Sequence, residues 1–216
     1  YPGEVEAVVT NLDTGAAEYF PLDRRDDKFK LLQATCALPF LFPVFHIQGR
    51  PCMDGGAADA IPYERAFAKG WDRVIVVLTR EREYVRRPEK LQPLIDLAYR
   101  KYPKFCDTMR RRADAYNEAR QKLFRLEREG RALVFTPTST EGFHRTERDV
   151  DKIKALWKDG WDQGLARLDE AEAFLKEGKQ AEYRSEMEKV SNMNGEIKDL
   201  QDLIQEQDRK FMEKAP

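Results

Sequence analysis

The chain has 216 residues, of which 41% are hydrophobic and 36% charged, and its formal net charge is −1. A net charge this close to zero argues against a general binder of nucleic acid, and no apolar run approaches the ~20 residues of a membrane span. Cys36, Cys52 and Cys106 form no C-x-x-C pair. This cysteine pattern argues against a disulfide scaffold or a zinc site, and it favours a reducing, cytoplasmic location.

The first 80 residues alternate strand and helix patterns. The run Val5–Thr10, the turn-forming stretch Asn11–Gly15 and the returning run Ala17–Phe20 together predict a β-hairpin.

A short helix is expected next, capped by Asp27 and ended by Pro39. Cys36 lies near the end of this helix, where we expect it in the core. The stretch "PFLFPVFHI" contains two prolines, so it predicts a buried irregular segment rather than a central strand. We expect His46 to be packed within that segment.

A second helix is framed by Pro62, which suits a first helical turn, and by Gly70, which suits a C-terminal cap. The continuous apolar run Arg73–Thr79 predicts a strand that is buried on both faces. The order of strand, helix and buried strand favours an α/β fold.

Residues beyond about 90 are expected to be mostly helical. Apolar side chains recur every three or four positions and predict a long amphipathic helix ended by Gly130. They are Phe105, Met109, Ala113, Tyr116, Ala119, Leu123 and Leu126. The run Ala132–Pro137 predicts a strand, and Thr146 with Asp149 resembles a capping box that opens another helix.

The last part of the chain has a seven-residue rhythm. It is carried by Tyr183, Val190, Ile197, Ile204 and Phe211. This spacing predicts a helical tail that packs either on its own chain or against a second copy, so a homo-oligomer through the tail is one expectation. We divide the chain into residues 1–85, a helical and β extension at 86–160, and the amphipathic tail at 161–216.

Three linked motifs in the first 80 residues occur in the order and spacing of a known family. They are "VVTNLDTGAAEYF", "ATCALPFLFPVFHIQGRPCMDGG" and "AADAIPYERAFAKGWDRVIVV". Together they resemble the patatin-like acyl hydrolases, and the later stretch "YRKYPKFCDTMRRRADAYNEA" is similar to the C-terminal part of one bacterial branch. The resemblance implies a partial patatin-like α/β sheet flanked by helices, with a helical C-terminal extension. It also implies hydrolysis of fatty-acyl esters of lipids, without a cofactor or metal.

The resemblance further implies a Ser-Asp dyad, in which a serine of a Gly-x-Ser-x-Gly turn attacks the ester and an aspartate takes its proton. Asp54 matches that catalytic aspartate by position, and Gly55 and Gly56 match the glycines beside it, where substrate would approach. A carboxylate is a weak base in water, so the role requires an acid that is held in place and partly dry. The residues alone also allow a plain Asp-Gly turn.

The sequence departs from the family at the nucleophile. Its serines are Ser139, Ser185 and Ser191, and none lies in a Gly-x-Ser-x-Gly motif. We therefore expect the C-terminal part of a longer phospholipase or esterase, which supplies the base but not the serine and is inactive alone. We expect His144 to be exposed, and neither it nor His46 to build a triad.

Two alternatives remain open. One is a non-catalytic binding or assembly module that uses the helical tail and the basic section Arg80–Arg131, which holds 16 Lys/Arg against 9 Asp/Glu. That section either attracts anionic lipid, at about 1 kcal/mol per residue near the surface, or is a solvated helix face. The other alternative is an unrelated hydrolase that uses two carboxylates, such as Asp54 and Asp59. The partners we expect are a lipid or acyl-ester substrate and a transient membrane surface, but no nucleic acid.

Overall fold

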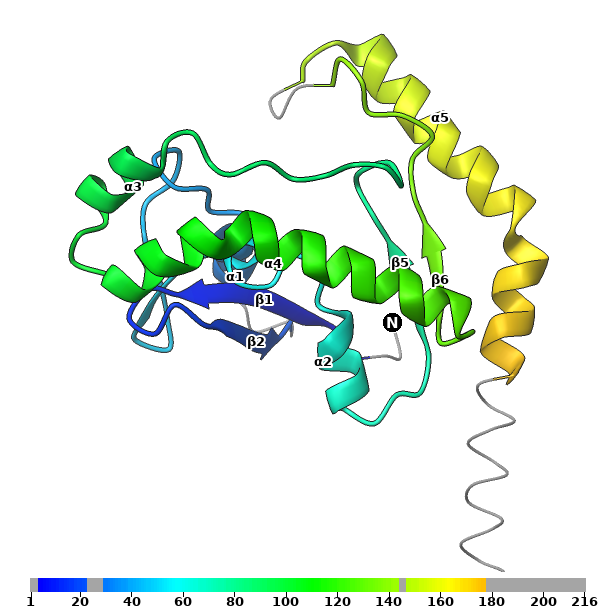
Figure 1. Ribbon diagram of the computed structural model, residues 1–216, viewed down its shortest axis with the longest axis horizontal. Helices are drawn as coiled ribbons and strands as arrows, with labels where there is room; N and C mark the ends of the chain where they lie inside the picture. The colour runs from blue at the N-terminus through cyan, green and yellow to red at the C-terminus, as the bar shows by residue number, and fades with distance from the viewer. Residues whose placement is uncertain (1–3, 23–28, 144–146, 178–216) are drawn as a thin grey trace, which may run out of the picture. The chain divides into compact units, whose positions relative to one another are not determined.

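The computed structural model describes residues 4–22, 29–143 and 147–177 (Figure 1). Its contacts divide the chain into two units, residues 1–163 and 164–216. The predicted seven-residue pattern of the tail lies outside the described residues. Within the described part, no helix is long and apolar enough to cross a membrane.

Four strands form an antiparallel sheet in the order β2-β1-β4-β3. Their bounds are Glu6–Asn11 (β1), Ala17–Pro21 (β2), Phe45–Ile47 (β3) and Arg50–Asp54 (β4). β1 and β2 pair as the predicted hairpin, so that prediction is confirmed. β1 also pairs with β4, where Val9 lies opposite Asp54. Asp54 is therefore the last residue of an inner strand.

A second sheet consists of two parallel strands, Val74–Val77 (β5) and Ala132–Phe135 (β6). The helical elements are Lys30–Thr35 (α1), Gly55–Ala57 (η2, a 3₁₀ turn), Tyr63–Ala68 (α2), Gln92–Ala98 (α3), Pro103–Arg128 (α4) and Val150–Ala166 (α5). Helices flank the sheets and dominate the C-terminal region (Figure 1). The predicted α/β class is confirmed.

The long helix α4 contributes to two apolar clusters. Its first turns bring Phe105 and Met109 into a cluster with Met53 of β4. Farther along, Leu123 packs in a cluster with Val134 of β6. Six of the seven side chains in the predicted spacing are buried, and the helix ends near Gly130, whose φ is 70°. One amphipathic helix thus supports both sheets, because its buried face is long enough to reach each of them.

The other helix ends follow local signals. Pro62 precedes α2 directly, and Gly70 follows its end with a φ of 93°, as predicted. Asp149 caps α5, since its Oδ1 accepts hydrogen bonds from the backbone N–H groups of Asp151 (3.0 Å) and Lys152 (3.3 Å). Thr146, the other member of the predicted capping box, lies outside the described residues, as does Asp27.

The segment before β4 is more exposed than predicted. Phe40, Leu41 and Phe42 are 45%, 63% and 49% exposed, and the last three residues of "PFLFPVFHI" form β3 rather than an irregular stretch. His46 is exposed on β3, because side chains alternate along a strand and Ile47 takes the buried position. The predictions that this segment is buried and that His46 is packed are therefore wrong. The prediction that the segment forms no central strand is confirmed, because β3 lies at the edge of the sheet.

Two further burial predictions fail for geometric reasons. α1 ends at Thr35, so Cys36 is the residue that follows the helix. The buried face of α1 consists of Leu31 and Ala34, and Cys36 is exposed. β5 is a strand as predicted, but Val77 is 75% exposed. Among the described residues β5 belongs to a two-stranded sheet, and no second layer covers the outer face of Val77.

Candidate active site

Asp54 ends β4, and its side chain is 15% exposed. Its Oδ1 accepts a hydrogen bond of 2.9 Å from the backbone N–H of Gly56, which caps the turn η2. Its Oδ2 lies 3.4 Å from Nη2 of Arg112 on α4. The carboxylate is therefore held at both oxygens and mostly shielded from water.

The backbone around Asp54 is fixed from two sides. Its N–H donates to the carbonyl of Ala37 at 3.0 Å, and its carbonyl accepts from Oγ1 of Thr10 at 2.8 Å. Thr10 is fully buried, and its Oγ1 in turn accepts from the N–H of Ala58 at 3.1 Å. These contacts with β1, with the residue after α1 and with the end of η2 hold the strand end in one position.

The two glycines have different surroundings. Gly55 is buried, and a Cβ built there would lie 2.2 Å from the carbonyl oxygen of Val8, so only glycine fits. Gly56 is partly exposed, and a Cβ there would lie 3.3 Å from Oδ1 of Asp54. The close approach of β1 accounts for Gly55, whereas Gly56 leaves space beside the carboxylate. Contact of either glycine with substrate stays a prediction.

Arg112 is the residue of this site that the sequence did not single out. Its Nε donates to the carbonyl of Gly56 at 2.8 Å, and its side chain is 10% exposed. In the sequence it is the third of three consecutive arginines, which read as a basic patch. The one available signal is its place three residues after Met109, beside the apolar stripe of the helix.

A cavity of about 490 Å³ opens next to the turn. Gly56 and Arg112 line it, together with the small and aromatic side chains Ala57, Ala58, Ala60, Ile61, Ala115, Ala119, Tyr19, Tyr63 and Tyr116. Asp54 itself is not among the residues that line the cavity. The wall also includes the charged residues Asp59, Glu64, Glu118 and Lys122, so it combines apolar and charged groups.

Asp59 lies in the wall of the cavity but has its own partners. Its Oδ2 accepts from the hydroxyl of Tyr19 at 2.6 Å, and its Oδ1 accepts from the N–H of Ile61 at 3.3 Å. Burial, followed by the hydrogen bond to Asp59, raises the pKa of Tyr19 well above its ordinary value, so its hydroxyl stays a donor. Among the described contacts, none joins Asp59 to Asp54.

Neither Cys52 nor Ser139 suits the role of a nucleophile beside Asp54. Burial, then the charge of Glu18, raises the pKa of the Cys52 thiol to about 11, and Cys52 is fully buried. Ser139 lies in the exposed loop after β6, where its Oγ accepts from the N–H of Glu141. Ser185, Ser191 and His144 lie outside the described residues. Within the described part of the chain, no group of three or more His, Cys, Asp or Glu could hold a metal ion.

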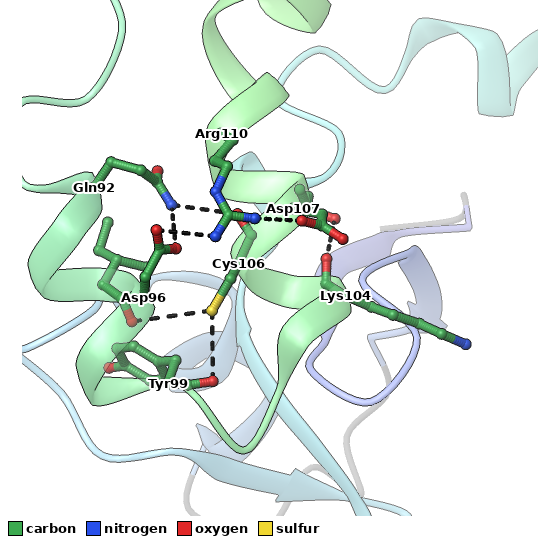
Figure 2. Close-up of polar contacts among 9 residues, drawn as sticks. Gln92, Asp96, Tyr99, Lys104, Cys106, Asp107 and Arg110 are labelled. Atoms are coloured by element: carbon green, nitrogen blue, oxygen red, sulfur yellow. Dashed lines mark hydrogen bonds and ion pairs between the residues drawn. The ribbon is translucent and has the colours of Figure 1, made fainter.

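The basic section is largely engaged in contacts within the fold. Arg110 of α4 contacts Asp96 of α3 and also Asp107 (Figure 2). Nη2 of Arg110 lies 2.9 Å from Oδ2 of Asp96. Burial opposes ionisation of Asp96, but hydrogen bonds from Gln92 and Arg110 outweigh it and lower the pKa of this carboxyl. These contacts hold α3 on α4, so the basic pattern at this point is structural.

Comparisons with known proteins match two separate parts of the chain. Residues 3–67 match the model of the patatin-like phospholipases. Residues 102–176 match a domain of unknown function (DUF6363), called here the DUF6363 segment. No curated protein matches the chain. The described fold, with sheets flanked by helices, is consistent with a partial patatin-like fold. The segment that carries Asp54 therefore matches the patatin-like phospholipases, a family of lipid acyl hydrolases.

Proposed function

We propose that the chain supplies the catalytic base, Asp54, of a lipid acyl hydrolase that works by a Ser-Asp dyad. The observation that carries this proposal is that the Asp54 carboxylate is held in place and largely buried. It is held by Gly56 and Arg112, it is 15% exposed, and it lies within the segment that matches the patatin-like phospholipases. A positioned and partly dry carboxylate meets the requirement for a general base.

The proposed reaction needs a serine from a Gly-x-Ser-x-Gly turn that the 216 residues lack. Its Oγ bonds to the acyl carbon while its proton passes to Asp54, and the electrons of the carbonyl π bond move to the oxygen. Collapse of this intermediate expels the alcohol, which takes the proton from Asp54. Water then hydrolyses the acyl-enzyme, with Asp54 again as the base. Oxyanion donors would come from the same missing part.

An exposed apolar surface near Asp54 supports docking of such a part. The carbonyl of Ala37 accepts from the N–H of Asp54, and the exposed side chains Phe40, Leu41 and Phe42 follow shortly afterwards. Phe40 has a φ of 67°, a conformation that bulky residues rarely adopt. Large apolar side chains that are exposed together are typical of interaction sites. We place the serine-bearing segment against these side chains.

The test begins with the coding sequence upstream of Tyr1, which we expect to encode Gly-x-Ser-x-Gly. In the protein that includes it, Asp54→Asn should slow hydrolysis of a short-chain p-nitrophenyl ester by at least about 10²-fold. Its melting temperature should stay close to that of the wild type, because asparagine still accepts from Gly56. The exposed Asp13→Asn is the matched control. Wild-type rates in the Asp54 variant would refute the assignment.

The same assay separates the alternatives. Labelling of a serine by a fluorophosphonate supports the dyad. Equal losses in Asp54→Asn and Asp59→Asn without such labelling support the two-carboxylate hydrolase. The isolated 216-residue chain should release no p-nitrophenol.

An assembly module is the second candidate function, and α5 favours it. Trp157 and Trp161 stack with ring centroids 5.5 Å apart and are 64% and 56% exposed. On this hypothesis the apolar face of α5 and the tail bind a second copy of the chain. Absence of any upstream serine motif, with a dimer that dissociates in a Trp157→Ala and Trp161→Ala double variant, would favour it. We also propose a cytoplasmic location and transient contact with a lipid surface.

A further inference from the structure

The three consecutive arginines of α4 have three different environments. Arg110 pairs with Asp96 of α3 (Figure 2), and Arg111 is exposed. Arg112 faces the Asp-Gly-Gly turn, and its side chain is 10% exposed. A run that resembles a uniform basic patch thus contains one side chain that is directed at Asp54, the proposed catalytic base.

The guanidinium of Arg112 holds the turn and the carboxylate at once. Its Nε donates to the carbonyl of Gly56 at 2.8 Å, which fixes the plane of the group, and Nη2 then lies 3.4 Å from Oδ2 of Asp54. Oδ1 is held more closely, at 2.9 Å from the Gly56 N–H. Oδ2 has the longer contact, so it keeps lone-pair capacity for the proton of an incoming hydroxyl.

Packing along α4 fixes the position from which Arg112 reaches the turn. Met109 belongs to the same buried cluster as Met53, the residue before Asp54. Thr108 Oγ1 donates to the carbonyl of Gly15 at 2.7 Å, and a Cβ at Gly15 would lie 2.6 Å from the Lys104 carbonyl oxygen. The helix therefore approaches the β1–β2 turn so closely that a side chain there has no room.

From these contacts we propose that Arg112 is a positioning residue for Asp54, and that the DUF6363 segment is in this way a working part of the hydrolase site. The inference rests on the proposed function of Asp54. Arg112 contacts the carboxylate of Asp54, but no bond to Arg112 forms or breaks in the proposed reaction. It holds the carboxylate in the orientation that accepts the serine proton, and its bond to Gly56 keeps the turn in place after the carboxylate has been neutralised.

The test uses the protein that contains the upstream serine motif. Arg112→Met should lower kcat for a neutral p-nitrophenyl ester by about 10²-fold and leave KM unchanged. The reason is that a small displacement of a catalytic group from its productive position lowers the rate by about this factor. Arg111→Met, at the exposed neighbouring position, is the matched control and should keep the wild-type kcat. Arg112→Lys should recover part of the rate, because an ammonium reaches one partner but lacks the planar fork.

A chemical rescue separates positioning from support of the fold. Guanidinium ion, added to Arg112→Ala well below denaturing concentration, should raise kcat, whereas sodium chloride at equal ionic strength should not. Loss of rate without rescue, together with a lowered melting temperature, would reduce Arg112 to a structural residue and overturn the proposal.

Two other results would also overturn it. Wild-type kcat in Arg112→Met, while Asp54→Asn is inactive, removes the positioning role and leaves the dyad standing. A higher KM for anionic phospholipid with unchanged kcat assigns Arg112 to head-group binding instead. If Asp54→Asn is as active as the wild type, the proposed function fails first, and the inference about Arg112 fails with it.

Discussion

Arg65 of α2 donates two hydrogen bonds of 2.9 Å to the carboxylate of Glu6 on β1, one from Nε and one from Nη2. The hydrogen bond from Arg65 is the main cause that holds the pKa of Glu6 at about 2, below its ordinary value of 4.5, although burial opposes it. The folded chain therefore releases this proton more readily than the unfolded chain does.

The pair predicts a window of acid sensitivity. A lowered pKa contributes stability above about pH 4.5, and this contribution is lost as the pH falls toward 2, because the unfolded state then binds the proton first. The difference in unfolding free energy between the wild type and Glu6→Gln should therefore be largest above pH 4.5 and shrink toward pH 2. Urea titrations at several pH values measure it, with the exposed Glu83→Gln as control. A difference that stays constant with pH would contradict the assignment.

The buried Arg120 predicts a large loss of stability on neutral substitution. It is 3% exposed, and its Nη2 donates to the carbonyls of Glu81 (2.7 Å) and Arg82 (3.0 Å). Arg120→Met removes these bonds and leaves two carbonyls with fewer partners, so we expect a loss of about 2–3 kcal/mol in unfolding free energy.

The exposed Arg125→Met on the same helix should change the unfolding free energy by less than about 0.5 kcal/mol, which makes it the matched control. Chemical denaturation compares the two variants. Equal effects would mean that the loop after β5 does not depend on Arg120.

Gly55 should tolerate no side chain. A Cβ at 2.2 Å from the carbonyl oxygen of Val8 forces β1 and the turn apart, so Gly55→Ala should lose about 1–3 kcal/mol of stability. Gly160→Ala is the control, because that position lies in α5 with nothing within 4 Å, and alanine there should add about 0.5–1 kcal/mol. Thermal melts of the two variants should shift in opposite directions. An unchanged melting temperature in Gly55→Ala would show that the strand end can relax.

The cysteines predict selective modification. Cys36 is exposed, whereas Cys52 and Cys106 are buried, and burial is the main cause that raises the pKa of both buried thiols. Iodoacetamide should therefore modify Cys36 in the native protein and all three after denaturation. Peptide mapping by mass spectrometry identifies the sites. Native labelling of Cys52 would indicate that β4 opens on the timescale of the reaction.

Local signals made much of the fold predictable. The Asn11–Gly15 turn lies between two apolar runs, and this is sufficient for the hairpin. The three- and four-residue spacing predicts α4, and glycines with positive φ follow α2 and α4 where the pattern stops. The match to the patatin-like phospholipases covers the motif around Asp54, so Asp54 could be identified as a candidate site residue from the sequence.

Contacts between segments that are distant in the sequence were harder to predict. Arg112 and Asp54 are 58 positions apart. The signal for the arginine that turns inward is weak, because it consists of the place of Arg112 three residues after Met109. The burial of Arg120 was easier to predict, because Arg120 lies between Tyr116 and Leu123 in the apolar stripe of α4. The prediction of burial was wrong where a strand has few neighbours. Val77 belongs to an apolar run that is typical of a core strand, but in the described part of the chain β5 has a neighbouring strand on one side, and Val77 is exposed.

The parallel pairing of β5 with β6 has a consequence for how the chain folds. The whole of α3 and α4 lies between the two strands, so they cannot meet as a local hairpin does. Closing so long a connection is entropically unfavourable before α4 has docked, and pairing of this type slows folding. We therefore expect the hairpin and α4 to assemble early and the strand pair to join last, which makes weakened docking of α4 a kinetic defect as well as a thermodynamic one.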